Sequence, residues 1–245
     1  MTREVQAVLL VLVGGAILRI SLGTTYLNYV KEGMRPYLIA SGALLLLLGV
    51  LALVDAVRHW RQREGAADEG GHAQGGHAQG GHANGGPRAA WLLLLPVLAI
   101  FLIAPPALGA YTAARDTTNA APPAQPKAPP LPAGDPVQVY VSDYVSRAVW
   151  DDGLTLAGRV VEMTGFVTPD PDGGWWLTRL TLTCCAADAV TSKVKAVGAD
   201  DLAANTWVTV TGTWEAGGGT NSTAAIPLLR VQTLAEVPQP ENPYE

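Results

Sequence analysis

Three long apolar stretches occupy the first 111 residues, and the rest of the chain alternates apolar and polar positions at short range. The stretches cover about 5–26, 36–57 and 89–111. Each approaches the roughly 20 residues that a helix needs to cross the hydrocarbon core of a bilayer. Residues 1–111 are therefore predicted to form a transmembrane region with three spanning helices. A cleavable signal peptide is the alternative for the first stretch alone, but two further stretches follow it directly.

Basic residues beside these stretches predict their orientation. Arg58, Arg61 and Arg63 follow the second stretch as a cluster, and such clusters favour the cytoplasmic side. We therefore expect a multi-pass protein of the plasma (inner) membrane, with a cytoplasmic N-terminus and everything after Tyr111 outside. Arg19 lies near the outer end of the first stretch. It either snorkels to the surface or is an intramembrane polar residue that contacts a partner helix or a polar pathway.

The loop at 58–88 contains a glycine-rich repeat with His72, His77 and His82 at a strict period of five. Glycine, alanine and glutamine cannot build a packed core, so a flexible loop is expected. Imidazole is a common ligand for zinc, copper and nickel. The three histidines are therefore a secondary candidate metal site, and an expanded, inert linker is the alternative.

Residues 112–136 are rich in proline and predict an extended linker. From 137 onward, short alternating segments separated by turn residues indicate a small all-β domain. A helix is expected at 142–150, a helical turn at 200–204, and five strands at about 159–168, 175–183, 189–197, 206–214 and 226–237. This order is typical of an OB-like, five-stranded open barrel over 137–245. A small β-sandwich is the alternative.

Charge and composition exclude several function classes. The net charge of −5 and pI near 5.3 argue against nucleic acid as a partner, because phosphate binding requires a basic surface. The sequence shows no Ser/His/Asp pattern and no phosphate loop, so no catalytic residues and no enzymatic activity are expected. Both cysteines of the chain are adjacent, at Cys184 and Cys185.

The cysteines end the second predicted strand. Neighbours in a regular strand point to opposite faces, which would put Cys184 inside with Leu180 and Leu182, and Cys185 outside with Arg179. The two sulfurs act together only where the strand breaks at the pair.

Three interpretations of the cysteines follow. The first is a soft-metal site for zinc or copper(I), made by Cys184 and Cys185 with Asp188 or with a ligand from another chain. The second is a vicinal disulfide that acts as a redox switch. The third is structural, with one buried thiol and an accidental neighbour.

Several features along the chain occur together: the early spans with Arg19, the strand at 161–167, the block Arg179…Cys184-Cys185-x-Ala-Asp188-Ala189, the strand at 206–212, and Pro240-x-x-Pro243-Tyr244. In these features the chain resembles the YcgQ-like family of bacterial permease subunits, over nearly its whole length except the histidine repeat and the proline linker. Members of the family accompany a larger multi-spanning permease. The resemblance therefore implies an accessory subunit with a link to metal homeostasis, and it carries over no catalytic residues.

Together, these observations predict an accessory, substrate-capturing subunit of a plasma-membrane permease for a transition metal such as zinc. The expected partners are the lipid bilayer and a larger permease, because three spans are too few to form a transport pathway alone. An oligomer of this chain could also supply the additional spans. The alternatives are a membrane-anchored thiol redox module and a structural scaffold for a partner membrane protein.

Overall fold

The computed structural model describes residues 3–67, 105–119 and 128–245, which form two compact units. One unit holds the two N-terminal helices, and the other holds the β-domain together with Leu27–Lys31 and the chain from Pro106 onward. Residues 106–111, placed by the sequence in the third span, thus belong to the β-domain unit. The rest of that span, at 89–104, and the histidines His72, His77 and His82 lie outside the described residues.

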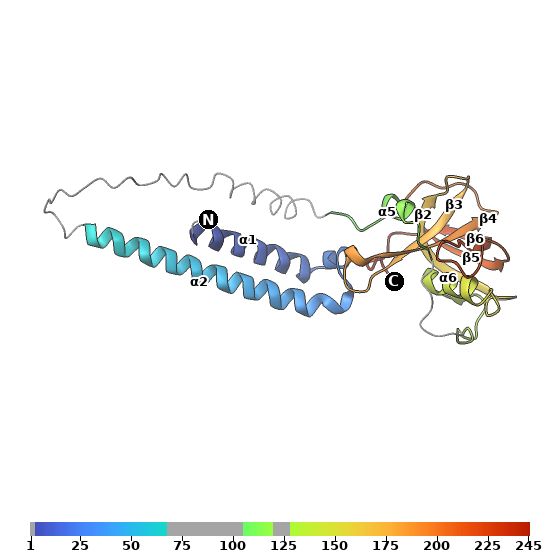
Figure 1. The fold of residues 1–245 in the computed structure, drawn as a ribbon, viewed down its shortest axis with the longest axis horizontal. Coiled ribbons are helices and arrows are strands. Elements are labelled where there is room, and N and C mark those ends of the chain that lie inside the picture. Colours follow the sequence, from blue (N-terminus) through green and yellow to red (C-terminus); the bar gives the residue numbers. More distant parts are fainter. Residues whose placement is uncertain (1–2, 68–104, 120–127) are drawn as a thin grey trace. The chain divides into compact units, whose positions relative to one another are not determined.

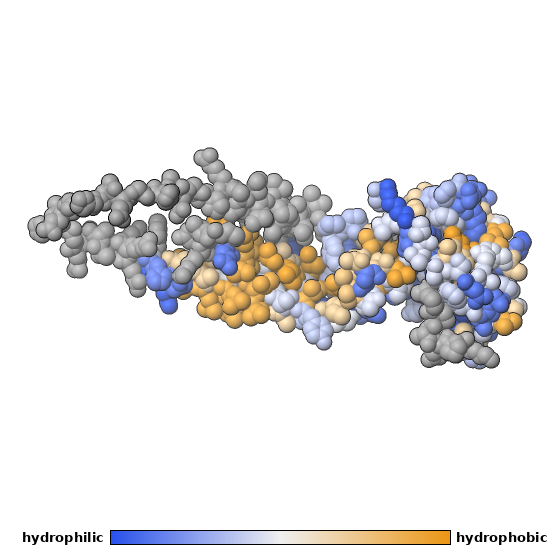
Figure 2. Space-filling model, in the orientation of Figure 1, coloured by the Kyte–Doolittle hydropathy of each residue, from blue (hydrophilic) through white to orange (hydrophobic). Residues whose placement is uncertain are grey.

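Helices α1 (Arg3–Leu22) and α2 (Arg35–Ala67) are joined by two short 3-10 turns, η1 (Thr25–Asn28) and η2 (Glu32–Met34). Within them, Val5–Leu22 and Glu32–His59 are long and apolar enough to cross a membrane. Figure 2 shows an apolar band over these helices. Its exposed members on α2 include Leu44, Leu47, Leu48, Leu51 and Val54. Two of the three predicted apolar spans are therefore long helices.

Glycines allow α1 and α2 to pack closely in antiparallel directions. A Cβ atom added at Gly14 would lie 2.7 Å from the backbone nitrogen of Leu46, and one added at Gly49 would lie 2.8 Å from that of Val11. Small residues at such positions are what allow apolar helices to approach closely in a membrane. The side chain of Arg35 then donates to the carbonyl of Ser21 and satisfies the C-terminal end of α1.

The β-domain is a closed five-stranded barrel (Figure 1). Its strands are β2 (Val160–Pro169), β3 (Trp175–Thr181), β4 (Val190–Val197), β5 (Trp207–Glu215) and β6 (Leu228–Glu236). The order is β2-β3-β4-β6-β5, and β5 pairs again with β2 to close the barrel. The β4–β6 pair is parallel and the other barrel pairs are antiparallel. A two-residue strand, β1 (Val137–Gln138), pairs in parallel with β2.

The strand predictions agree with this barrel closely, with two corrections. The barrel is closed rather than open, because β2 and β5 pair over seven residues from Val160 to Phe166. The helical turn expected at 200–204 is not a helix; the chain makes only a tight turn there, at Ala204 and Asn205. Closure and strand order remain compatible with an OB-like barrel.

Helix α6 (Val141–Trp150) packs against the main barrel core. Its buried residues Val141, Tyr144, Val145, Ala148 and Val149 recur at the three- and four-residue spacing of an amphipathic helix. Strand residues such as Met163 and Trp175 fill the same core. The buried Tyr144 hydroxyl donates to the carbonyl of Leu228 at 2.6 Å, so the helix is also fixed by a hydrogen bond.

A second apolar cluster joins the preceding chain to the barrel. It contains Ala110 and Ala113 of α5 (Ala110–Arg115), with Phe166, Leu180, Leu182 and Tyr244. The buried Lys193 ammonium donates to the carbonyls of Ala113 and Asp116 at 3.1 and 2.6 Å. Leu180 and Leu182 are thus buried, as the alternation predicted, but against α5 rather than in the main core.

Candidate functional site: the cysteine turn

Strand β3 ends at Thr181, before either cysteine. Cys184 and Cys185 lie in the cysteine turn (residues 183–188), whose last three residues form the 3-10 turn η3 (Ala186–Asp188). The strict in-and-out alternation of a strand therefore does not apply to the pair. The condition under which the two sulfurs act together, a break in the strand, is met.

The Asp188 side chain organises this turn. One carboxylate oxygen accepts the backbone N–H of Thr183 at 3.0 Å, and the other accepts that of Cys184 at 2.9 Å. Aspartate commonly bonds to nearby backbone donors in this way, which stabilises tight turns. The carboxylate is thereby fixed beside the cysteines, and one ligand atom from each of Cys184, Cys185 and Asp188 lies within 4.8 Å of the others.

The separation of the sulfurs suits a tetrahedral metal. The Sγ atoms of Cys184 and Cys185 are 3.6 Å apart. Two thiolates bound to one tetrahedral zinc ion, with Zn–S bonds of about 2.3 Å, would be separated by about 3.8 Å. Cys184 is exposed and Cys185 is partly exposed, so an ion reaches both sulfurs from solvent.

The hydrogen bond to the Asp188 carboxylate keeps Cys184 in the thiol form when no metal is bound. Its hydrogen bond to Asp188, followed by that to Cys185, raises the pKa of the Cys184 thiol to about 12. The same hydrogen bond from Cys184 lowers the pKa of the Asp188 carboxyl. A divalent cation would offset this negative charge, whereas a reactive thiol requires a nearby cation that lowers its pKa.

A segment far away in sequence holds the turn in place. Leu27–Lys31, here called the strap, pairs with it through an antiparallel bridge between Val30 and Cys185. The N–H of Lys31 donates to the carbonyl of Cys184 at 3.0 Å, and the N–H of Ala186 donates to that of Tyr29 at 2.7 Å. These backbone bonds fix both sides of the cysteine pair.

Tyr244 connects the strap to the rest of the β-domain. Its hydroxyl donates to the carbonyl of Asn28 at 3.0 Å and accepts the N–H of Leu108 at 2.9 Å. The ring is buried in the cluster around α5. Burial also raises the pKa of the Tyr244 phenol, so it stays neutral and able to donate.

The structure thus brings together Cys184, Cys185 and Asp188, the candidate metal ligands. It does not describe His72, His77 and His82, and it leaves Arg19 exposed on α1 in the helical unit. Arg179, predicted to face outward, is instead buried at 8% exposure, because the chain near Asn242 and Glu245 covers it.

Sequence reasoning missed the strap and the role of Tyr244 in holding it. The strap lies in the short connection between two predicted apolar stretches, and nothing in its composition indicates a pairing with the cysteines. A signal for Tyr244 was present, because the Pro240-x-x-Pro243-Tyr244 motif follows the last strand and ends in an aromatic residue.

The described features define a small closed barrel with an exposed cysteine turn. Residues 139–245 match the family model of the DUF1980 C-terminal domain, so a domain of this kind is found over the barrel and the turn. The chain matches no curated protein and no solved structure.

Proposed function

We propose that this protein is an accessory, substrate-capturing subunit of a plasma-membrane permease, and that it binds a soft transition metal such as zinc. The observation that carries the proposal is the convergence of Cys184, Cys185 and Asp188 on one exposed point. Two sulfurs and a carboxylate oxygen are a donor set that suits zinc. The two apolar helices support a membrane anchor for this site.

The incomplete coordination fits capture rather than permanent storage. Three protein ligands leave one position of a tetrahedral ion for water or for a donor from another protein. A structural zinc site has four protein ligands and is closed, whereas this turn is exposed. The captured ion would pass to a larger multi-spanning permease, because two described helices are too few to enclose a pathway.

Two further elements of the proposal rest on the sequence. The cluster Arg58, Arg61 and Arg63 favours a cytoplasmic N-terminus. With the third span that the sequence predicts at 89–111, the β-domain would then lie outside the cell. His72, His77 and His82 then form a weaker, cytoplasmic metal site. A third element, the OB-like class of the β-domain, is supported by its strand order and closure.

A thiol redox module is the second candidate function, and the 3.6 Å separation of the sulfurs favours it. A vicinal disulfide would form from the two free thiols with loss of two protons and two electrons to an external oxidant. The raised pKa of Cys184 weighs against this reading, since thiolate is the form that reacts.

Zinc titration of the full-length chain in detergent tests the proposal. The background variant carries alanine at His72, His77 and His82, so that the histidine repeat does not contribute to the zinc binding that is measured. We expect one zinc ion per chain, and loss of that binding in Cys184→Ser, Cys185→Ser and Asp188→Asn. Asp172→Asn, in the exposed β2–β3 loop, is the matched control and should bind as tightly as the background.

Stoichiometric zinc binding that survives both serine substitutions would show that the cysteine turn is not the zinc site. Intact mass spectrometry of the same sample separates the redox alternative. A reducible species about 2 Da lighter than the dithiol, together with no preference for zinc, would favour the disulfide.

A further inference from the structure

The connection between the cysteine turn and the second apolar stretch is short. Lys31, whose N–H bonds to the carbonyl of Cys184, precedes Pro36, the first residue of that stretch, by five residues. The 3-10 turn η2 and the first residues of α2 fill this interval, so the path measures about 10 Å at a rise of about 2.0 and 1.5 Å per residue. The polar layer of a bilayer is itself about 5–8 Å thick on each side. Once α2 spans a membrane, the cysteine turn therefore stays close to the lipid headgroups.

A second connection enters the β-domain beside the first. Pro106 already belongs to the β-domain unit, and the apolar stretch that the sequence predicts at 89–111 runs directly into it. The N–H of Leu108 donates to the Tyr244 hydroxyl at 2.9 Å, and this hydroxyl donates to the carbonyl of Asn28 in the strap at 3.0 Å. One buried side chain therefore joins both connections, and they reach the barrel at the same place.

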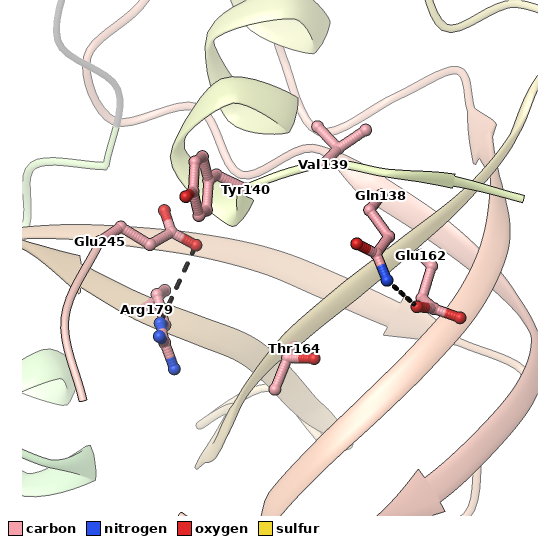
Figure 3. A pocket seen from close by; sticks show the side chains of 7 residues that line it. All are labelled: Gln138, Val139, Tyr140, Glu162, Thr164, Arg179 and Glu245. Carbon is pink, nitrogen blue, oxygen red and sulfur yellow. Dashed lines mark hydrogen bonds and ion pairs between the residues drawn. The ribbon is translucent and has the colours of Figure 1, made fainter. Parts of the chain in front are cut away.

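The segment that carries Tyr244 is fixed to the barrel. The N–H of Glu245 donates to the carbonyl of Leu180 at 2.9 Å. Its carboxylate pairs with the Arg179 guanidinium at 3.9 Å, as Figure 3 shows, and accepts the N–H of Val141 at 2.8 Å at the start of α6. The place where both connections meet is thus anchored in the β-domain rather than on a loose tail.

The chain that follows the second connection is packed on the barrel and does not act as a spacer. Ala113 is buried in the cluster around α5, and Asn119 is only 2% exposed. The side-chain amide of Asn119 donates to the carbonyls of Lys193 and Ala225 at 3.0 and 2.6 Å. Residues 112–119, which the sequence assigned to an extended linker, therefore add no free length between the barrel and the apolar stretches.

Exposed side chains at this end of the β-domain suit a headgroup layer. The strap end is defined here as the strap, the cysteine turn and α5, which packs on Leu180 and Leu182 at the end of β3. Tyr111 of α5 is 74% exposed, and the Arg115 guanidinium lies over its ring at 3.6 Å. Arg115 and Lys31 are also exposed. Tyrosine is enriched where membranes meet water, and arginine and lysine donate to phosphate oxygens, so these side chains fit lipid headgroups.

We propose that the strap end of the β-domain rests on the lipid headgroups and that the cysteine turn lies in this layer. The proposal rests on the membrane anchor of the proposed function and is independent of the metal. The far end of the barrel then faces away from the membrane. Asp172, just before β3, and Arg230, which pairs with Val197 at the end of β4, are exposed residues of that far end. Strand β3 alone, with 7 residues, separates the two ends by about 23 Å.

Bimane fluorescence of the full-length chain in phosphatidylcholine vesicles, with and without a nitroxide on the lipid headgroup, tests this contact. Both natural cysteines are replaced by serine, so that one introduced cysteine carries the label and metal binding plays no part. Ala187→Cys in the cysteine turn and Tyr111→Cys on α5 are compared with Asp172→Cys and Arg230→Cys at the far end; all four positions are exposed. We expect the nitroxide to quench the first two labels several-fold more strongly than the last two.

Carbonate extraction of the same vesicles separates two kinds of failure. A chain that carbonate removes has no membrane anchor, which would overturn the anchor of the proposed function and this contact together. A chain that stays in the vesicles while its four labels are quenched equally, or not at all, would overturn the contact alone. Because Ala187 and Tyr111 lie on different segments, one of them still decides the matter if the other variant fails to fold.

Discussion

The backbone N–H of Lys31 donates to the carbonyl of Cys184 at 3.0 Å, which ties the chain between the two apolar helices to the candidate metal ligands. The strap is five residues long and is covalently continuous with α1 on one side and α2 on the other. Its pairing with the cysteine turn means that a change in the conformation of the strap alters the backbone that carries both sulfurs.

Removal of the Tyr244 hydroxyl should loosen this arrangement. In Tyr244→Phe, the N–H of Leu108 and the carbonyl of Asn28 lose their shared partner. A buried group left unsatisfied costs about 1–3 kcal/mol, so we expect the free energy of unfolding of the β-domain to fall by that amount. Urea unfolding of the full-length chain, followed by tryptophan fluorescence, measures it. Tyr140→Phe, an exposed tyrosine, is the control, and equal stability of the two variants would contradict this role.

Zinc affinity at the cysteine turn should increase with pH. The pKa of Cys184 is raised to about 12 by Asp188 and then by Cys185, so this thiol is protonated at neutral pH and zinc must displace its proton. Each displaced proton makes the affinity rise about tenfold per pH unit below the thiol pKa. Competition titrations over about pH 6 to 8 measure the slope. A slope of zero, or one unchanged in Cys184→Ser, would show that this thiol is not a ligand.

Gly14 and Gly15 of α1 allow a matched pair of substitutions that tests the close contact between α1 and α2. A methyl group at Gly14 would lie 2.7 Å from the backbone of Leu46, whereas one at Gly15 meets nothing within 4 Å. Gly14→Ala should therefore destabilise the contact between α1 and α2 by about 1–3 kcal/mol through overpacking. Gly15→Ala should be neutral or slightly stabilising, because alanine favours helix. Disulfide crosslinking efficiency between cysteines placed on the two helices gives the readout, and equal effects would argue against close packing.

The Glu245 side chain should stabilise α6 by accepting hydrogen bonds from the first turn of the helix. It accepts the N–H groups of Val141 and Ser142 and also the Ser142 hydroxyl, at 2.6 to 3.0 Å. Capping interactions of this kind contribute about 0.5–2 kcal/mol, so Glu245→Ala should lower the unfolding free energy by that amount. Glu241→Ala, at an exposed position, should change it little. Thermal unfolding of both variants compares them, and an unchanged melting temperature in Glu245→Ala would refute the cap.

The strands were predictable from the sequence because apolar and polar positions alternate over much of β2 and β5, and glycine, proline or aspartate marks the turns. The first predicted strand, at 159–168, differs from β2 by one residue at each end. Helix α6 was predictable for the same reason, since its apolar positions recur at helical spacing. The grouping of Cys184 with Asp188 depends on the end of β3 at Thr181. The sequence is compatible with a strand end at this point but does not predict it.

The burial of Arg179 and the strap pairing depend on contacts between distant segments, and local patterns carry no record of these. Alternation placed Arg179 on an outer face, but the chain near Asn242 and Glu245 covers it. The strap and the cysteine turn are separated in sequence by α2, α6, β2 and β3. Backbone hydrogen bonds dominate that contact, and they leave no trace in side-chain identity.

Closure of the barrel also restricts how another protein can recognise this domain. Every one of the five described barrel strands has a neighbour on both sides. In β-augmentation, a peptide from another protein pairs as an added strand with an unpaired strand edge. None of these five strands has an edge that is unpaired over its full length, so this mode of binding is disfavoured. A protein that docks on this domain would contact its loops and side chains instead, and the exposed Cys184 on its turn is among the residues available for such a contact.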